Sequence, residues 1–188
     1  NRGMPVSCSG QFVGDSIESF YDNYREAAIL TKHGFGTSGS LGSIRPRGSS
    51  ISAGGTASGA VPVLKQFVQV MRDVAQGTSR RGAFASYLNI ESDDFWEAVD
   101  HLNQYPDDLI IGWNISNSFI EKLDSGDEEG LKRFKRSLKV KAVTGKGYYT
   151  FIDKVNEQNP KLYKAKGLEV SHSNLCVAPE PLILTDKG

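Results

Sequence analysis

The sequence predicts an α/β protein built on a largely parallel sheet, and three observations support this fold class. Short apolar runs of strand length alternate with amphipathic segments of helical length along the chain, which is the pattern of β-α-β units. The 188 residues are enough for one domain with its own core, and 38% hydrophobic with 23% charged residues is an ordinary globular composition. No internal repeat or low-complexity linker interrupts this pattern.

In the first half of the chain, local signals place the elements. Asp15 and Ser16 stand where a helix cap is expected, and Cys8 lies in the apolar run before them. A long Gly/Ser-rich segment follows the first helix, and irregular segments of this length in compact domains are usually functional. The elements expected in order are a strand within residues 4–13, a helix over 17–30, an irregular segment over 34–59 and a helix over 61–75.

The second half continues the alternation. Ser92 or Asp93 caps the next predicted helix, and the run over 109–115 is apolar enough to be a buried strand. The elements expected are a polar loop over 78–82, a strand over 83–90, a helix over 93–102, a strand over 109–115, helices over 117–123 and 128–143, and a strand over 147–152.

Charge and cysteine content exclude several functional classes. Lys plus Arg is 22 and Asp plus Glu is 22, so no global attraction to nucleic acid or to an acidic membrane is expected. No run is long and apolar enough to span a bilayer, and no secretory signal is recognisable. The chain opens at Asn1 without an initiator Met, which we interpret as a piece of a longer protein. Two cysteines far apart in sequence indicate a reducing compartment, and we expect a cytoplasmic protein.

Simple site motifs are weak. His33, His101 and His172 have no metal-ligand spacing with each other or with the cysteines, so structural or solvated roles are favoured for them. Gly34-Phe35-Gly36 could belong to a nucleotide glycine motif, but the full glycine-rich patterns are absent.

An ordered set of short motifs carries a stronger signal. It consists of Ser7-Cys8, Gly14-Asp15-Ser16, Lys32-His33-Gly34-Phe35-Gly36, Ile44-Arg45-Pro46-Arg47-Gly48, Gly59-Ala60-Val61-Pro62, Gln76-Gly77, Arg80-Arg81-Gly82-Ala83-Phe84 and Ser173-Asn174-Leu175-Cys176. In this order the set resembles the large, catalytic subunit of ribonucleotide reductase, of the class I type found in bacteria and phages. The resemblance covers residues 1–176 and implies about the first half of a ten-stranded α/β barrel.

The resemblance implies a set of catalytic and substrate-binding residues. Cys176 matches the cysteine that becomes a thiyl radical and takes the 3′ hydrogen of a ribonucleotide. Cys8 matches one member of the dithiol that supplies reducing equivalents as the 2′ hydroxyl leaves as water. Asn174 matches an asparagine that hydrogen-bonds the ribose, Ser7 matches a substrate-contacting serine, and Gly34 a glycine whose backbone approaches the substrate. These types suit the roles, because thiols perform reversible redox chemistry and an amide offers both donor and acceptor.

The resemblance also implies an allosteric site for a deoxynucleotide or ATP effector. Asp15 and Ser16 match effector contacts with Ile17 beside them, and Arg45 matches a contact to the effector phosphates, for which a guanidinium fork is well suited. Without the resemblance, Asp15 and Ser16 would be interpreted as a helix cap and Arg45 as part of a solvated turn.

A second loop over residues 78–82 matches the segment that passes effector identity to the substrate base. Either Arg80 or Arg81 would contact the substrate, and the spacing leaves both open. The implied partners are a small radical-generating subunit, a reductant of the thioredoxin or glutaredoxin type and a second copy of the complete subunit. No cofactor is expected in this chain itself, because the radical would come from the metal-containing small subunit or from adenosylcobalamin. No nucleic-acid or membrane partner is expected.

The pattern breaks after Cys176. The family has a catalytic glutamate two residues later, where this chain has Ala178, and Glu180 is displaced too far to take that role. Residues 176–188 resemble the start of an intein, in which the cysteine thiol attacks the preceding carbonyl. We therefore expect two segments, a reductase segment over residues 1–175 and the start of an intein over residues 176–188.

Three alternatives stay open. The residues after Cys176 could be an idiosyncratic stretch of an uninterrupted reductase, either of class I or of the adenosylcobalamin-dependent class II. The chain could be a non-catalytic nucleotide-binding module, or a plain α/β domain whose two thiols are inert. In the favoured interpretation the isolated chain is inactive, and its uncovered sheet edges make it poorly soluble.

Overall fold

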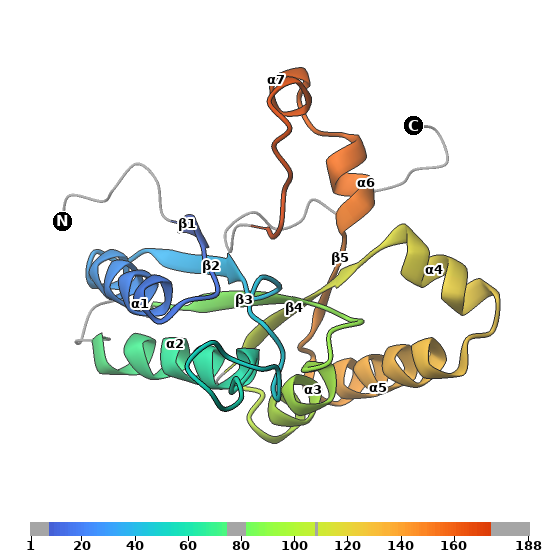
Figure 1. Ribbon diagram of the computed structural model, residues 1–188, viewed down its shortest axis with the longest axis horizontal. Helices are drawn as coiled ribbons and strands as arrows, with labels where there is room; N and C mark the ends of the chain where they lie inside the picture. Colours follow the sequence, from blue (N-terminus) through green and yellow to red (C-terminus); the bar gives the residue numbers. More distant parts are fainter. Residues whose placement is uncertain (1–7, 75–81, 108, 174–188) are drawn as a thin grey trace.

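The computed structural model describes residues 8–74, 82–107 and 109–173. Its centre is a five-stranded sheet in which every neighbouring pair is parallel and the strand order follows the chain (Figure 1). The strands are β1 (Cys8–Phe12), β2 (Gly36–Ser40), β3 (Phe84–Asn89), β4 (Ile110–Ile115) and β5 (Tyr148–Phe151). The α/β fold predicted from the alternation is therefore confirmed.

The crossover helices cover one face of the sheet. Consecutive parallel strands joined by right-handed crossovers place their helices on the same side, and α1, α2, α3 and α5 lie together below the strands in Figure 1. The short helices α6 and α7 lie on the other side. The helices are α1 (Ile17–Lys32), α2 (Ala60–Val74), α3 (Phe95–Gln104), α4 (Asn117–Asp124), α5 (Glu128–Thr144), α6 (Ile152–Glu157) and α7 (Lys161–Ala165). Within the described ranges, no helix has the length and apolar character needed to cross a bilayer.

The hydrophobic core lies between the sheet and these helices. The ring of Phe67 from α2 stacks on Phe84 of β3 with centroids 3.8 Å apart, and Trp113 of β4 packs on Phe95 of α3 at 4.9 Å. Phe67, Phe95 and Trp113 are at most 1% exposed. Because side chains alternate across a strand, the neighbours of Phe84 and Trp113 in sequence point to the opposite face, which we call the inner face.

The last described part of the chain, around Ser171 and His172, covers part of the inner face. The side-chain amide of Asn114 donates a hydrogen bond to the carbonyl of Ser171 at 2.9 Å, and the His172 ring lies 6.0 Å from the Tyr87 ring. Asn114 and Tyr87 alternate with core residues Trp113 and Leu88, so the segment runs across the side of the sheet that the large helices leave open.

Three elements differ from the sequence-based predictions. The segment 34–59 was expected to be irregular, yet it contains β2, whose sequence Gly-Thr-Ser-Gly-Ser has no apolar residue. Four of its five residues are buried, because it is a central strand flanked by β1 and β3 and small side chains suffice there. Helices α6 and α7 were also missed, and neither has a buried residue, so they have no amphipathic pattern to detect. The other predicted helices and strands are confirmed within a few residues at their ends.

Candidate functional site

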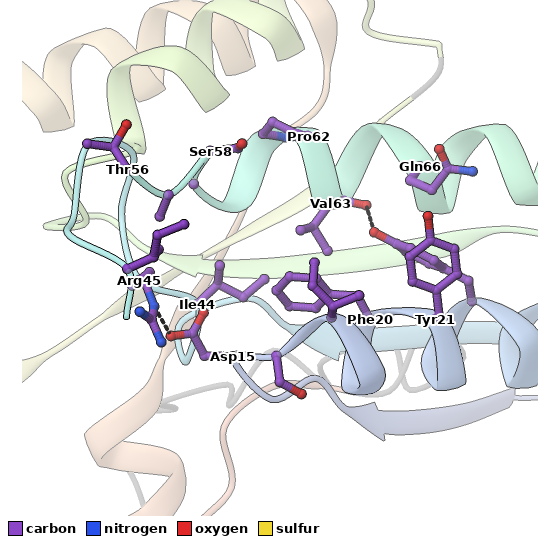
Figure 2. Close-up of a pocket in the computed structure, with 16 residues that line it drawn as sticks. Asp15, Phe20, Tyr21, Ile44, Arg45, Thr56, Ser58, Pro62, Val63 and Gln66 are labelled. Carbon is purple, nitrogen blue, oxygen red and sulfur yellow. Dashed lines mark hydrogen bonds and ion pairs between the residues drawn. The ribbon is translucent and has the colours of Figure 1, made fainter. Parts of the chain in front are cut away.

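A pocket of about 510 Å³ opens at the carboxyl ends of β1 and β2. Its walls are the start of α1, the loop between β2 and α2, and the first turns of α2 (Figure 2). This volume is within the range of small-molecule sites. Parallel α/β sheets commonly bind ligands at the carboxyl ends of their strands, where the connecting loops converge. All four residues predicted to contact an effector line it: Asp15, Ser16, Ile17 and Arg45.

Arg45 and Asp15 face each other across the mouth of this pocket. The Arg45 Nε donates to Asp15 Oδ2 at 2.5 Å, and Arg45 Nη1 donates to the carbonyl of Ser50 at 3.3 Å. The side chains of Arg45 and Asp15 are 41% and 27% exposed, so both remain accessible to a ligand. The structure therefore presents one cation and one anion side by side at a solvent-open site.

Ser16 and Ile17 have different local environments. Ser16 is the N-cap of α1, since its Oγ accepts a hydrogen bond from the Ser19 N–H at 3.1 Å; the cap interpretation is therefore confirmed for Ser16. Asp15 is committed to Arg45 instead. Ile17 is 65% exposed, which leaves its side chain available for contact with a ligand.

An aromatic wall formed by α1 was missed as part of a site. Phe20, Tyr21 and Tyr24 line the pocket, and the sequence assigned them only to the apolar face of a helix. Tyr24 donates to the carbonyl of Val63 on α2 at 3.3 Å, and burial, with Tyr21 nearby, raises the pKa of Tyr24 to about 12. The sequence carries no signal that separates these residues from a helix face packed on the core, although Tyr21 is 68% exposed in the structure.

The opposite wall is a small hairpin within the loop between β2 and α2. Ser50 and Thr56 form an antiparallel bridge, and the Ala57 N–H donates to the Ser49 carbonyl at 2.8 Å. Thr56 and Ser58 line the pocket with hydroxyl groups. The part of the Gly/Ser-rich segment that the sequence marked as functional thus forms an ordered rim rather than an open loop.

Cys8 lies away from this pocket, at the amino end of β1. It is 4% exposed and pairs in register with Gly36 of β2. Two residues further along the same face, a Cβ added to Gly10 would lie 2.8 Å from His172 Nε2. Burial lowers the pKa of His172, and burial raises the pKa of Tyr87 although its hydrogen bond to Ser173 opposes the change. Cys8 therefore shares the inner face of the sheet with the buried side chain of Tyr87 and the partly buried side chain of His172.

The same face carries buried polar atoms without hydrogen-bond partners in the described part of the chain. Ser38 Oγ and Asn114 Oδ1 are both of this kind. Ser38 pairs with Ala85 of β3 on one side and with Gly10 of β1 on the other. Buried polar groups in folded proteins normally find partners, so this face has the polarity of a site rather than of a core.

Gly34 is placed at the carboxyl end of α1. Its φ is +82°, and its N–H donates to the Thr31 carbonyl at 2.8 Å while the Phe35 N–H donates to Leu30 at 3.0 Å. This left-handed helix end explains a glycine by itself. A Cβ at Gly34 would meet no atom within 4 Å, so the described residues contain nothing that requires a close backbone approach there.

Cys8 and Gly34 lie at the amino edge of the sheet, whereas Asp15 and Arg45 lie at its carboxyl edge. The 16 residues of α1 separate the two edges, a distance of roughly 24 Å at about 1.5 Å per residue. The structure therefore brings the predicted effector residues together but does not join them to Cys8 in one cavity.

The remaining predicted site residues lie outside the described residues. They are Ser7, Arg80, Arg81, Asn174 and Cys176. Across the described part of the chain, no group of three or more His, Cys, Asp or Glu side chains is arranged to hold a metal ion.

Comparisons with known proteins agree on one family. The model of the family described as "Ribonucleotide reductase, barrel domain" matches residues 6–131. The chain is 29% identical to the ribonucleoside-diphosphate reductase large subunit of Invertebrate iridescent virus 6, over 100% of this chain and 22% of that protein. It is 30% identical to the vitamin B12-dependent ribonucleoside-diphosphate reductase of Thermoplasma acidophilum, over 84% of this chain and 23% of that protein.

A solved structure supports the same assignment. The Actinobacillus ureae class Id ribonucleotide reductase alpha subunit superposes with a TM-score of 0.82 at 34% identity, over 93% of this chain and 32% of that one. The chain thus spans about a fifth to a third of the length of these relatives. Since the family model covers more than half of the sequence, this chain belongs to the ribonucleotide reductase barrel-domain family.

Proposed function

We propose that the protein containing this chain is a ribonucleoside-diphosphate reductase large subunit, and that this chain supplies the first part of its barrel. The names of the matched relatives and the parallel half-barrel support this. The relatives include a vitamin B12-dependent enzyme and a class Id subunit, so a small metal-containing subunit and adenosylcobalamin are both compatible as radical source. In either case the proposed reductant is a dithiol protein of the thioredoxin or glutaredoxin type.

The proposed chemistry uses Cys8 as one thiol of a redox pair. A thiyl radical on another cysteine takes the 3′ hydrogen of the ribose and later returns it. In between, the 2′ hydroxyl leaves as water and two thiols lose one hydrogen each to form a disulfide, so the ribonucleotide is reduced by two electrons. The burial of Cys8, which is 4% exposed, supports this role, because a radical intermediate must be kept from solvent.

Replacing Cys8 with Ser in the complete subunit tests this chemistry. The variant keeps a side chain of similar size but has no redox-active thiol, so turnover driven by a dithiol donor is expected to fall to background while effector binding is retained. The assay is deoxynucleotide formation from a ribonucleoside diphosphate, with effector binding as the folding control. Undiminished turnover would refute the redox role of Cys8.

The pocket at the carboxyl ends of β1 and β2 is the proposed effector site for a deoxynucleoside triphosphate or ATP. The observation that carries this proposal is the convergence of Asp15, Ser16, Ile17 and Arg45 on one pocket. Arg45 offers a guanidinium to phosphate oxygens, Asp15 offers an acceptor to sugar hydroxyls, and the aromatic wall from α1 offers apolar contact. Equilibrium dialysis of dTTP with the complete subunit tests it: dTTP should bind, and binding should weaken when Asp15 is replaced by Asn.

Residues 176–188 carry the proposed start of a protein-splicing element. The support is the change of sequence character at Cys176 and the absence of a glutamate at position 178. The Cys176 thiol would attack the Leu175 carbonyl, converting the peptide bond to a thioester and freeing the amine. Expression of the complete gene and mass spectrometry of the product test this, since a splicing element predicts a product shorter than the translated frame. A product of full translated mass would contradict it.

A further inference from the structure

Asp94 links two distant parts of the chain behind the proposed effector pocket. It is 3% exposed. Its Oδ1 accepts the backbone N–H of Arg47 at 2.9 Å and its Oδ2 accepts the backbone N–H of Ala60 at 2.7 Å. Arg47 begins the hairpin segment and Ala60 is the first residue of α2, so one buried carboxylate holds both ends of the loop that forms the pocket rim.

This carboxylate is not used for its own helix. Asp94 occupies the N-cap position of α3 but makes no side-chain cap hydrogen bond there. It lies instead at the amino end of α2, where a negative charge is favoured by the helix dipole. Gly59 accommodates it closely, since a Cβ at that position would lie 2.7 Å from Asp94 Oδ2. The glycine at position 59 therefore leaves room for the Asp94 carboxylate, which binds the loop that precedes α2.

Glu97, in the first turn of α3, holds the same loop residue from the outside. Its Oε2 accepts from Arg47 Nε at 2.7 Å and its Oε1 accepts from Arg47 Nη2 at 2.9 Å. This two-point geometry fixes the orientation of the guanidinium as well as its position. Arg47 is thus bound through its backbone by Asp94 and through its side chain by Glu97.

The anchored loop carries Arg45 to its place. Arg45 lies two residues before Arg47 and donates to the carbonyl of Ser50 in the hairpin and to Asp15 across the pocket. Neither Asp94 nor Glu97 lines the pocket. We infer that Asp94 and Glu97 are positioning residues of the effector site, which hold the loop so that Arg45 faces the phosphates of a bound deoxynucleotide. This inference rests on the proposed effector function.

The test compares a ligand that has phosphates with one that lacks them, in the complete subunit. Dissociation constants for dTTP and for thymidine are measured by equilibrium dialysis for the native protein, Asp94→Asn and Glu97→Gln. Asn keeps the size of Asp but presents one acceptor where two are needed. We expect dTTP binding to weaken about tenfold in D94N and about threefold in E97Q, the scale of losing part of a charge-assisted contact. Thymidine binding should change by less than about twofold, because only the phosphate contact is displaced.

Asp100→Asn is the matched control. Asp100 is another α3 aspartate, 63% exposed and paired with Arg136 of α5, so its loss changes the charge of the same helix without touching the loop. D100N should bind both ligands as the native protein does. Equal losses for dTTP and thymidine in D94N and E97Q would indicate general damage and overturn the inference, as would unchanged dTTP binding in both. If D94N does not fold, the E97Q result alone decides by the same criterion.

Asp15→Asn and Arg45→Ala separate this inference from the function on which it rests. If both bind dTTP as tightly as the native protein, the pocket is not the effector site and the proposed function fails. If both weaken dTTP binding while D94N and E97Q do not, the effector site stands and only the positioning role is refuted.

Discussion

The sharpest test of the proposed effector site is the replacement of Arg45 by Ala. Two interpretations of Arg45 predict different outcomes. If Arg45 only stabilises a surface turn, its removal affects stability and no ligand. If it binds phosphate, its removal affects dTTP affinity much more than stability.

The structure sets the expected magnitudes. The Arg45–Asp15 pair has side chains that are 41% and 27% exposed, and ion pairs of this kind contribute about 0.2–1 kcal/mol to folding after solvent screening. A lost hydrogen bond between a cation and a phosphate costs about 1.5–3 kcal/mol in binding, which corresponds to roughly 10–150-fold in Kd. For a chain of this size, about 1 kcal/mol lowers Tm by about 2–4 °C.

The assay is equilibrium dialysis of dTTP with the complete subunit, accompanied by a thermal melt. We expect R45A to lose at least about tenfold in dTTP affinity with a Tm lowered by no more than about 4 °C. Arg136→Ala is the control, since Arg136 also pairs with a partly exposed aspartate, at 2.7 Å, on the far helices α3 and α5. It removes the same charge and should leave dTTP affinity unchanged. If R45A binds dTTP with native affinity, the proposed contact between Arg45 and phosphate is refuted. If R136A loses as much dTTP affinity as R45A, the effect is one of overall charge and not of a specific contact.

Two further predictions concern the inner face. A Cβ at Gly112 would lie 2.3 Å from Tyr87 Cε1, so Gly112→Ala should lower the free energy of unfolding by about 1–3 kcal/mol. The double variant G112A/Y87A should recover part of this loss, because the clashing ring is removed. An unchanged melting temperature in G112A would contradict the close packing of Gly112 against Tyr87. Burial lowers the pKa of His172, so below about pH 6.5 the unfolded chain binds more protons than the folded one and stability falls as the pH is lowered through this range. The Tm of the native chain minus that of His172→Gln should therefore be larger at about pH 7.5 than at about pH 5.5, and a difference independent of pH would show that His172 is not desolvated.

The candidate site could be predicted from the sequence only in part. Asp15, Ser16, Ile17 and Arg45 were assigned together by resemblance, and the structure places them in one pocket. Their role in effector binding remains a proposal. The rest of the pocket was not recognised, because Tyr24 has the spacing of a core residue and nothing in its neighbourhood distinguishes a pocket wall from a core. The assignment of Gly34 to substrate approach stays a prediction, since its left-handed conformation at the end of α1 accounts for a glycine without testing that role.

The order and type of most elements can be predicted from the residues alone, because the periodicity of apolar residues depends only on which face of a helix or strand is buried. The sequence could not reveal β2, whose Gly, Thr and Ser residues are buried by neighbouring strands rather than by their own hydrophobicity. It could not reveal the Asp94 anchor either, because Arg47 and Asp94 are 47 residues apart in the chain and are in contact only in the folded structure. Only the tertiary structure shows such a contact, because every residue except proline carries a backbone N–H group. The residue types at positions 47 and 60 therefore do not reveal that their N–H groups bind a carboxylate.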